Sequence, residues 1–210
     1  MGTMRPVNET STAEHLPGEL MTLEEWAAMP EDDEGELVDG VLVEEEMPDL
    51  THETVVAWLL YTLRSWLIPR RGFVFGSEAK FAVAPGRGRK PDLTVYLPGC
   101  PPLPRRGLVR IPPDVAIEVV SPTARDRRRD RSEKAGDYAT FGVRWYWLID
   151  PERRSLDILA LDDGRYQQIV TASTGLIGDV PGCEGLVLPL DELWAEVDRL
   201  ADIEPDDEAP

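Results

Sequence analysis

The chain has 210 residues, a net charge of −18 and 42% hydrophobic residues, which is enough for one domain with its own core. Its apolar runs are shorter than the roughly 18 residues that a membrane helix needs, its first residues lack the apolar segment of a signal peptide, and its two cysteines cannot form a disulfide framework. These features argue against a membrane-spanning protein and a disulfide scaffold, and they predict a cytoplasmic protein.

Basic residues are concentrated in one part of the chain. Twelve of the 22 Lys and Arg residues lie between Pro85 and Lys134 together with six Asp and Glu residues, so this segment carries +6 and the remainder −24. The distribution fits two interpretations, namely a solvated surface on an acidic protein or a patch that faces phosphate groups.

The first part of the chain predicts a short helix, a hairpin and a long helix after a disordered start at residues 1–20. Thr22, with Glu25 three residues later, is the signature of a capping box at the start of the short helix. The pair Asp39-Gly40 predicts the tight turn of a hairpin within residues 35–44. Apolar residues at helical spacing predict a core helix over residues 52–68.

The middle of the chain predicts several strands. Alternating Phe and Val residues predict one over residues 72–84, followed by a basic turn over residues 85–90. Short apolar runs predict further strands over residues 92–97, 114–120 and 145–150. The helix predicted over residues 126–141 starts with several arginines, and because positive charge there opposes the helix dipole, an external anion would compensate it. This helical crossover favours parallel pairing of the strands that flank it.

The last part predicts a hairpin around Asp162-Asp163-Gly164, a strand at residues 186–190 and a helix at residues 191–200, before an acidic, disordered tail at residues 201–210. The predicted domain therefore spans residues 21–200. Its fold class is α/β (α+β), with a central mixed sheet flanked by helices and an N-terminal hairpin.

Two acidic residues lie on predicted strands. Asp92 begins one strand, and Glu118 lies inside another that is expected to be buried on both faces. Because a buried carboxylate is unfavourable unless it is paired or holds a cation, the two residues suggest a Mg²⁺ or Mn²⁺ site. Such an ion polarises a phosphoryl oxygen and activates water for phosphodiester hydrolysis. The alternative is structural, with Asp92 as a strand-start residue and Glu118 as the partner of an arginine.

Three further residues are candidates for the same chemistry. Lys134 shares a helix face with Asp130 and Tyr138, and either stabilises negative charge near a metal or forms a surface ion pair. Glu36 in the hairpin is either a further metal ligand or a residue that faces water. His52 either begins its helix or transfers protons, and for a single histidine beside a helix cap the structural role is the more common.

Other site classes do not fit the spacing of the residues. The two histidines and two cysteines lack zinc-site spacing, and no phosphate-binding loop precedes a helix. Ser121 lacks the glycines of a nucleophile elbow.

Several short motifs occur in a characteristic order. They are Glu36-Leu-Val-Asp-Gly40, His52, Pro91-Asp92, Glu118-Val-Val-Ser-Pro122, Lys134 with Tyr138, Trp145-Tyr-Trp-Leu-Ile-Asp-Pro151 and the closing Leu-Pro-Leu-Asp-Glu-Leu-Trp194. In this order and spacing, the chain from Thr22 to Trp194 resembles the Uma-two family of restriction endonucleases, which belongs to the PD-(D/E)XK nuclease superfamily.

The resemblance implies a restriction-endonuclease-like core in which Asp92 and Glu118 hold Mg²⁺ (or Mn²⁺) at the ends of two adjacent strands. The nuclease motif also has a lysine two residues after its glutamate, where this chain has Val120. The resemblance therefore nominates Lys134, on the following helix, as the catalytic lysine. Glu36 matches a recurrent acid of the family and ranks after the other three residues.

The resulting prediction is a Mg²⁺-dependent endonuclease that hydrolyses phosphodiester bonds in DNA, with a homodimer expected because a double-strand cut needs two sites. Backbone phosphates are expected to bind Arg89, Lys90, Arg125, Arg127, Arg128, Arg129 and Arg131. The alternative is a non-catalytic module on the same fold that binds nucleic acid or protein, which the acidic total and Val120 favour. A third option is a nuclease that acts on RNA or on structured single strands.

Overall fold

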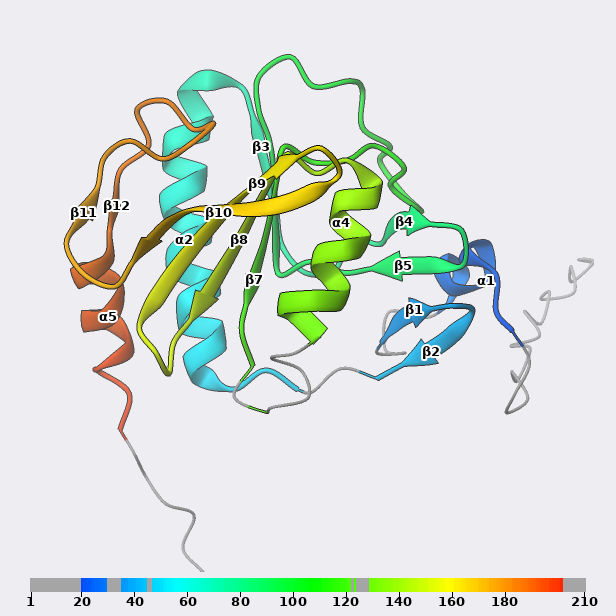
Figure 1. Cartoon of the computed structure of the whole chain (residues 1–210), viewed down its shortest axis with the longest axis horizontal. Helices are drawn as coiled ribbons and strands as arrows, with labels where there is room; N and C mark the ends of the chain where they lie inside the picture. Colours follow the sequence, from blue (N-terminus) through cyan, green and yellow to red (C-terminus); the bar gives the residue numbers. More distant parts are fainter. Residues whose placement is uncertain (1–19, 30–34, 45–46, 122, 124–128, 202–210) are drawn as a thin grey trace, which may run out of the picture.

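The computed structural model describes residues 20–29, 35–44, 47–121, 123 and 129–201. The segments predicted to be disordered, residues 1–20 and 201–210, lie outside this part except for Leu20 and Ala201. The described residues form a mixed α+β fold built on a six-stranded sheet (Figure 1). None of the described helices combines the length and the hydropathy needed to cross a membrane.

The large sheet places the predicted Glu118 strand near its centre. Its strands are, in spatial order, β10 (Arg165–Ala172), β9 (Ser155–Asp162), β8 (Trp145–Asp150), β7 (Val115–Val119), β6 (Leu93–Tyr96) and β3 (Phe73–Phe75). Strands β7 and β8 are parallel, whereas the other neighbours are antiparallel. The parallel pair confirms the pairing predicted from the helical crossover between these strands.

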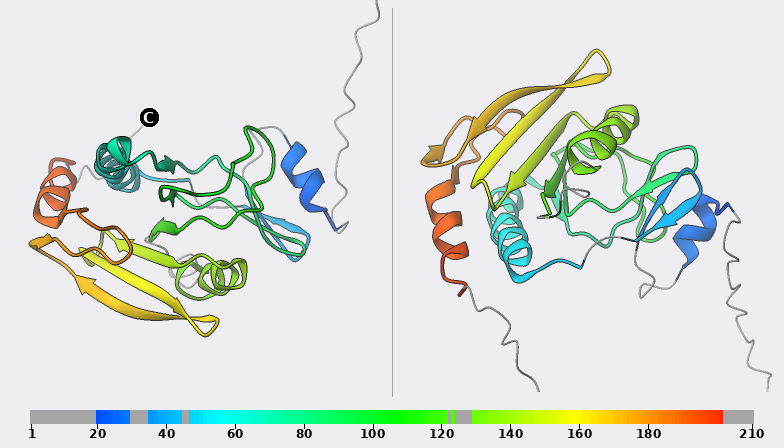
Figure 2. Two further views of the ribbon diagram at one scale, coloured as in Figure 1. Left: turned by 90° about the horizontal axis from the view of Figure 1, so that it is seen from above. Right: turned by 60° about the horizontal axis from the view of Figure 1, so that its bottom comes forward.

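The two faces of this sheet bury different cores. Helices α2 (Leu50–Leu67) and α5 (Leu190–Val197) share one core with Val115, Ile117 and Val119 of β7. Helix α4 (Ala135–Phe141) shares the other core with Ala116 and with Val120 just beyond β7. Figure 2 shows α2 and α5 on one side of the sheet and α4 on the other. Because side chains alternate along a strand, position 118 faces α4.

A smaller sheet packs beside the α4 face. It contains β2 (Val41–Val43), β1 (Glu36–Val38), β5 (Arg87–Arg89) and β4 (Phe81–Ala84). Asp39 and Gly40 form the predicted hairpin turn with φ angles of 52° and 79°. Helix α1 (Leu23–Ala28) begins at the predicted capping box of Thr22 and Glu25, and its Trp26 packs so closely on Gly88 that a Cβ there would overlap the ring.

The prediction of a single strand over residues 72–84 is wrong. The segment contains β3, at the edge of the large sheet, and β4, in the small sheet. The alternating aromatic pattern occurs on both sides of a turn and therefore resembles one strand: Phe73 and Phe75 are partly exposed, whereas Phe81 and Val83 are buried. The basic turn predicted at residues 85–90 includes strand β5, which pairs with both β4 and β1.

Several element boundaries also differ from the prediction. The described part of the basic helix is a π-helix, η2 (Arg129–Lys134), followed by α4, and its predicted start lies among residues 124–128, outside the described part. A short 3₁₀ turn, η1 (Ile68–Arg70), follows α2. The last predicted strand is the short β12 (Leu188–Pro189), which pairs with β11 (Leu176–Ile177).

Candidate functional site

Glu118 places a carboxylate inside the core under α4. Glu118 is 2% exposed, and it is the one charged residue in a strand whose other residues are apolar. Its Oε2 accepts a hydrogen bond of 2.9 Å from Lys134 Nζ, and its Oε1 accepts one of 2.6 Å from the Tyr138 hydroxyl. Both oxygens therefore have a donor from the helical segment that follows the strand.

Lys134 places its ammonium group among three carboxylates. Its Nζ lies 2.9 Å from Glu118 Oε2, 3.5 Å from Asp130 Oδ1 and 3.8 Å from Glu36 Oε1. These acids come from β7, from η2 and from β1, so three separate elements meet at this cation. Lys134 is 3% exposed, and the alternative of a surface lysine is therefore wrong. A buried ammonium needs such partners to offset its lost hydration.

The surroundings of Glu118 disfavour its charged form. Burial raises the pKa of this carboxyl group well above 4.5, and the negative charges of Asp92, Asp130 and Glu36 raise it further, whereas Lys134 lowers it. Because burial is the largest of these effects, an added positive charge would stabilise the site. Either a proton or a metal ion supplies that charge.

Asp92 lies at the end of the ladder between β6 and β7. The last paired residues are Leu93 and Ile117, and one more step in this antiparallel register sets Asp92 opposite Glu118. The Oδ2 atom of Asp92 accepts a hydrogen bond of 2.7 Å from the Val119 N–H. Because Asp92 contributes to the raised pKa of Glu118, the two carboxylates are close enough to interact electrostatically.

His52 begins helix α2 and also contacts Asp92. Its backbone N–H donates to the capping carboxylate of Asp49 at 2.8 Å, and its ring Nε2 lies 3.2 Å from Asp92 Oδ1. Burial lowers the pKa of the imidazole, but the hydrogen bond and the charge of Asp92 outweigh burial, so the pKa is raised above 6.5. The backbone thus has the predicted structural role, while the ring belongs to the site.

Glu36 is fixed by the small sheet and is held in its charged form. Its Oε2 accepts a hydrogen bond of 2.6 Å from Arg89 Nη1, and its Oε1 accepts one of 2.8 Å from the Lys90 N–H. Burial raises the pKa of Glu36, but the charges of Lys134 and Arg89 and these hydrogen bonds outweigh burial and lower it below 4.5. Glu36 is fully buried, so the interpretation that it faces water is wrong.

A family model described as "Uma2: Putative restriction endonuclease" matches residues 20–191, which include all of these side chains. The chain belongs to the Uma2 family. A crystal structure from Anabaena variabilis, titled as a putative nuclease belonging to DUF820, is similar with a TM-score of 0.68 and 21% identity, covering 84% of this chain and 99% of that chain. This likeness supports the predicted mixed sheet flanked by helices. A comparison with curated proteins gave no match.

The Uma2 fold brings four of the predicted residues together. Asp92, Glu118, Lys134 and Glu36 lie where the end of β7 meets η2 and β1. Val120, at the position of the motif lysine, is 4% exposed and belongs to the apolar core under α4. Lys134 is the lysine that reaches Glu118, as the resemblance implies, while the catalytic roles stay a prediction.

The carboxylate oxygens of this Uma2 site suit a hard divalent cation whose remaining ligands come from water or substrate. Within the described ranges, no three His, Cys, Asp or Glu side chains are grouped so that they could hold a metal ion. Asp92 and Glu118 offer two carboxylates, and Mg²⁺ is usually bound through one or two carboxylates together with water and substrate phosphates. The residues present therefore fit Mg²⁺ or Mn²⁺ bound jointly with substrate.

The prediction that Arg89 contacts phosphate is wrong. Its side chain is fully buried, and its guanidinium donates to Glu36 and, through Nε at 2.7 Å, to Asp137 Oδ2. The basic composition of residues 85–90 predicts an exposed turn, but the two acids neutralise this arginine inside the protein. Its role in the structure is to join β1 and β5 to α4.

The other predicted phosphate contacts differ in how far the structure describes them. The Lys90 side chain is 12% exposed, with Nζ 3.3 Å from Glu78 Oε2. Arg131 pairs with Asp150 at 3.1 Å and with Asp157 at 3.3 Å. Outside the described residues lie Arg125, Arg127 and Arg128, together with the side chain of Arg129.

Tyr138 is a site residue that the sequence-based candidate set left out. The signal was present, because Tyr138 follows Lys134 by one helical turn and belongs to the same motif. Its ring packs at a tilt against Tyr146 with 5.3 Å between centroids, and Tyr146 packs in turn against the partly buried Tyr166 at 5.5 Å. The hydroxyl of Tyr166 donates to the main-chain carbonyl of Val143 rather than to a carboxylate.

These contacts make Tyr138→Phe a test of the Glu118 hydrogen bond. We expect metal-dependent cleavage to fall by about 10–100-fold, as when a group that orients a metal ligand is lost. Tyr166→Phe removes a hydroxyl from the same stack without touching Glu118, and we expect it to leave cleavage within a factor of about two, because its partner is a main-chain carbonyl. Initial cleavage rates of the two variants measure the difference. Equal losses in both would show that Tyr138 acts through packing alone.

Proposed function

We propose that this protein is a metal-dependent endonuclease that hydrolyses phosphodiester bonds in DNA. The observation that carries the proposal is the contact of 2.9 Å between Lys134 and Glu118, beside Asp92, in a chain of this family. A motif lysine displaced from position 120 to the following helix reaches the same carboxylate from there. Asp92 and Glu118 are the residues that would hold Mg²⁺ or Mn²⁺.

The proposed roles of the residues follow from their contacts. The bound ion would supply a polarised phosphoryl oxygen and a water of lowered pKa. Lys134 would orient the attacking water and stabilise the negative charge that develops on the phosphoryl group. Glu36, ionised and held by Arg89, would keep the Lys134 ammonium charged. His52 would hold the Asp92 carboxylate in place.

The partners of the enzyme remain predictions. Phosphate contacts would come from the basic segment that contains Arg125, Arg127, Arg128 and Arg129, with Lys90. A homodimer would place two sites on one duplex for cleavage of both strands. A cytoplasmic location also stays a prediction.

The test is nicking of supercoiled plasmid by the purified protein with Mg²⁺ or Mn²⁺. We expect metal-dependent nicking that is lost in Asp92→Ala and in Glu118→Ala and is kept in Glu192→Ala, which replaces an exposed acid on α5. Nicking that persists in both site variants would identify a contaminating nuclease.

Absence of nicking by folded protein would favour the alternative, a non-catalytic module. The net charge of −18 and the valine at position 120 are the observations on that side. The salt dependence of DNA binding then separates the cases, because phosphate contacts make affinity fall steeply with salt. Lack of binding even at low salt would favour a protein partner.

A further inference from the structure

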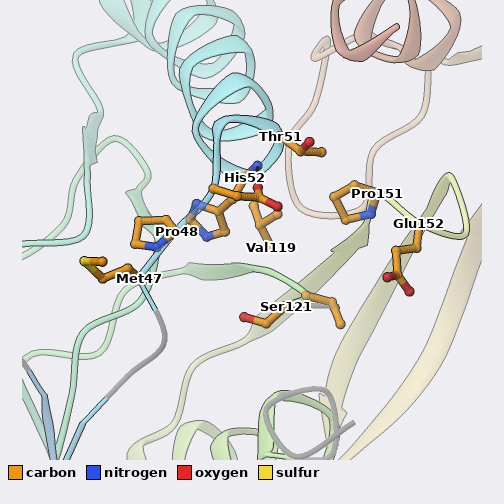
Figure 3. A pocket seen from close by; sticks show the side chains of 10 residues that line it. Met47, Pro48, Thr51, His52, Val119, Ser121, Pro151 and Glu152 are labelled. Atoms are coloured by element: carbon orange, nitrogen blue, oxygen red, sulfur yellow. Dashed lines mark hydrogen bonds between the residues drawn. The ribbon is translucent and has the colours of Figure 1, made fainter. Parts of the chain in front are cut away.

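A cavity of about 230 Å³ lies beyond the end of β7, between the first turn of α2 and the turn after β8 (Figure 3). Its walls include Met47, Pro48, Thr51, Ser121 and Glu152. The volume is far larger than the roughly 30 Å³ share of one water and just below the roughly 300–1,000 Å³ of sites for drug-sized ligands. It is therefore a cavity for one small ring system.

The cavity adjoins the candidate active site. Two of its lining residues contact Asp92: His52 through Nε2 at 3.2 Å and Val119 through its N–H at 2.7 Å. A phosphodiester held at Asp92 and Glu118 therefore has this cavity beside it. The part of the substrate that enters the cavity is then a group attached to a neighbouring sugar.

The chemistry of the walls selects among such groups. No lysine or arginine is among the described residues that line it, and Asp49 contributes a carboxylate, so a phosphate is a poor match. Met47, Pro48 and Pro151 provide apolar surface. A flat heteroaromatic ring with amino donors fits this combination, because its faces are apolar and its edge donates hydrogen bonds.

We propose that this cavity receives one unpaired nucleobase next to the phosphodiester that is cut. The inference rests on the proposed nuclease function and names its substrate class: nucleic acid with a base that is already unpaired or is turned out of the helix. A base inside a regular duplex has to leave its stack first, so a bulged or single-stranded nucleotide is the preferred substrate.

The test compares three duplexes of one sequence: one with a single bulged cytidine, one with an abasic nucleotide in its place, and one fully paired. We expect the protein to cut beside the bulged base at least tenfold faster than in the other two. Thr51→Phe fills the cavity and should lower the rate on the bulged duplex to that on the abasic one. Thr54→Phe, on the same helix but outside the lining, should keep the preference. Equal rates on bulged and abasic duplexes, or equal effects of the two variants, would overturn the inference.

A second variant covers the case in which Thr51→Phe does not fold. Met47→Trp enlarges an exposed side chain of the cavity lining. It should lower the preference for the bulged over the abasic duplex at least threefold, because the larger ring occupies part of the space of the base. An unchanged preference would contradict the assignment of a base to this cavity.

A binding measurement separates this inference from the proposed function. A single strand that contains 2-aminopurine is mixed with protein in the presence of a chelator, so no cleavage occurs. We expect at least a twofold change in fluorescence with the parent and Thr54→Phe, and none with Thr51→Phe. This fluorescence response, together with no cleavage in the separate assays that contain Mg²⁺ or Mn²⁺, would support the base site and refute the nuclease. Cleavage with equal rates on all duplexes would do the reverse, and neither cleavage nor a fluorescence change would refute both.

Discussion

Glu118→Gln is expected to reduce metal-dependent cleavage by at least about 10³-fold, equal to roughly 4 kcal/mol of transition-state stabilisation, while the protein stays folded. Glutamine has the size of glutamate, but its single amide oxygen can accept from the Tyr138 hydroxyl or from Lys134 and not from both, so one of the two hydrogen bonds is lost. It lacks the negative charge that binds a cation. Cleavage rates and thermal unfolding of the same preparation measure both effects. A variant that unfolds before it can be assayed would contradict the expectation.

The difference in stability between the parent and this variant should also depend on pH in a defined direction. Burial and nearby acids raise the pKa of Glu118 above 4.5 in the folded protein. Its protonation therefore stabilises the fold fully below the unfolded value, and this contribution is lost as the pH rises through the raised folded-state pKa. With a chelator present, the unfolding temperature of the parent should fall relative to Glu118→Gln over the pH range above about 4.5. A difference that stays constant over this range would show that Glu118 does not titrate as expected.

Lys134→Met should lose activity and stability together. The substitution leaves Glu118, Asp130 and Glu36 without the ammonium that all three approach. Breaking a buried pair in this way costs about 3–5 kcal/mol, which is about 6–20 °C in unfolding temperature for a chain of this size. Cleavage should fall by about 10²-fold or more, because the charge that stabilises the transition state is gone.

Two further variants make this expectation specific. Lys90→Met removes a lysine whose partner Glu78 is exposed, and its unfolding temperature should change little. Adding Glu118→Gln to Lys134→Met removes the acid that lies nearest to the lost ammonium and should restore part of the lost stability but none of the activity. Strict additivity of the two substitutions would show that the residues are not coupled.

The elements predicted from local patterns agree best with the structure. The capping box at Thr22, the Asp39-Gly40 turn and the apolar period of α2 each depend on neighbouring residues, and each forms as predicted. The parallel pairing of β7 and β8 followed from the helical crossover between them. The meeting of Asp92 with the end of β7 was implied by the family resemblance, since a sequence without that pattern does not define a register.

The wrong predictions concern residues whose surroundings come from distant parts of the chain. Phe75 and Phe81 share one alternating pattern but lie in different sheets, because a turn separates them. Arg89 lies in a basic segment that indicates an exposed turn, yet Glu36 and Asp137 neutralise it in the interior. Burial of a charged side chain depends on partners about fifty positions away in the sequence, so local composition does not reveal it.

The contacts of Lys134 also determine when during folding a complete site can exist. Its acidic partners come from the first hairpin, from the central strand and from its own helical segment, and Arg89 fastens that hairpin to α4. Contacts between such distant segments form late, because closing a long loop has an entropic cost before any contact compensates it. A chain that has folded its large sheet alone therefore holds Glu118 without the full set of charges around Lys134. If the protein is the nuclease proposed above, its full set of site contacts exists only after the N-terminal hairpin has docked beside α4.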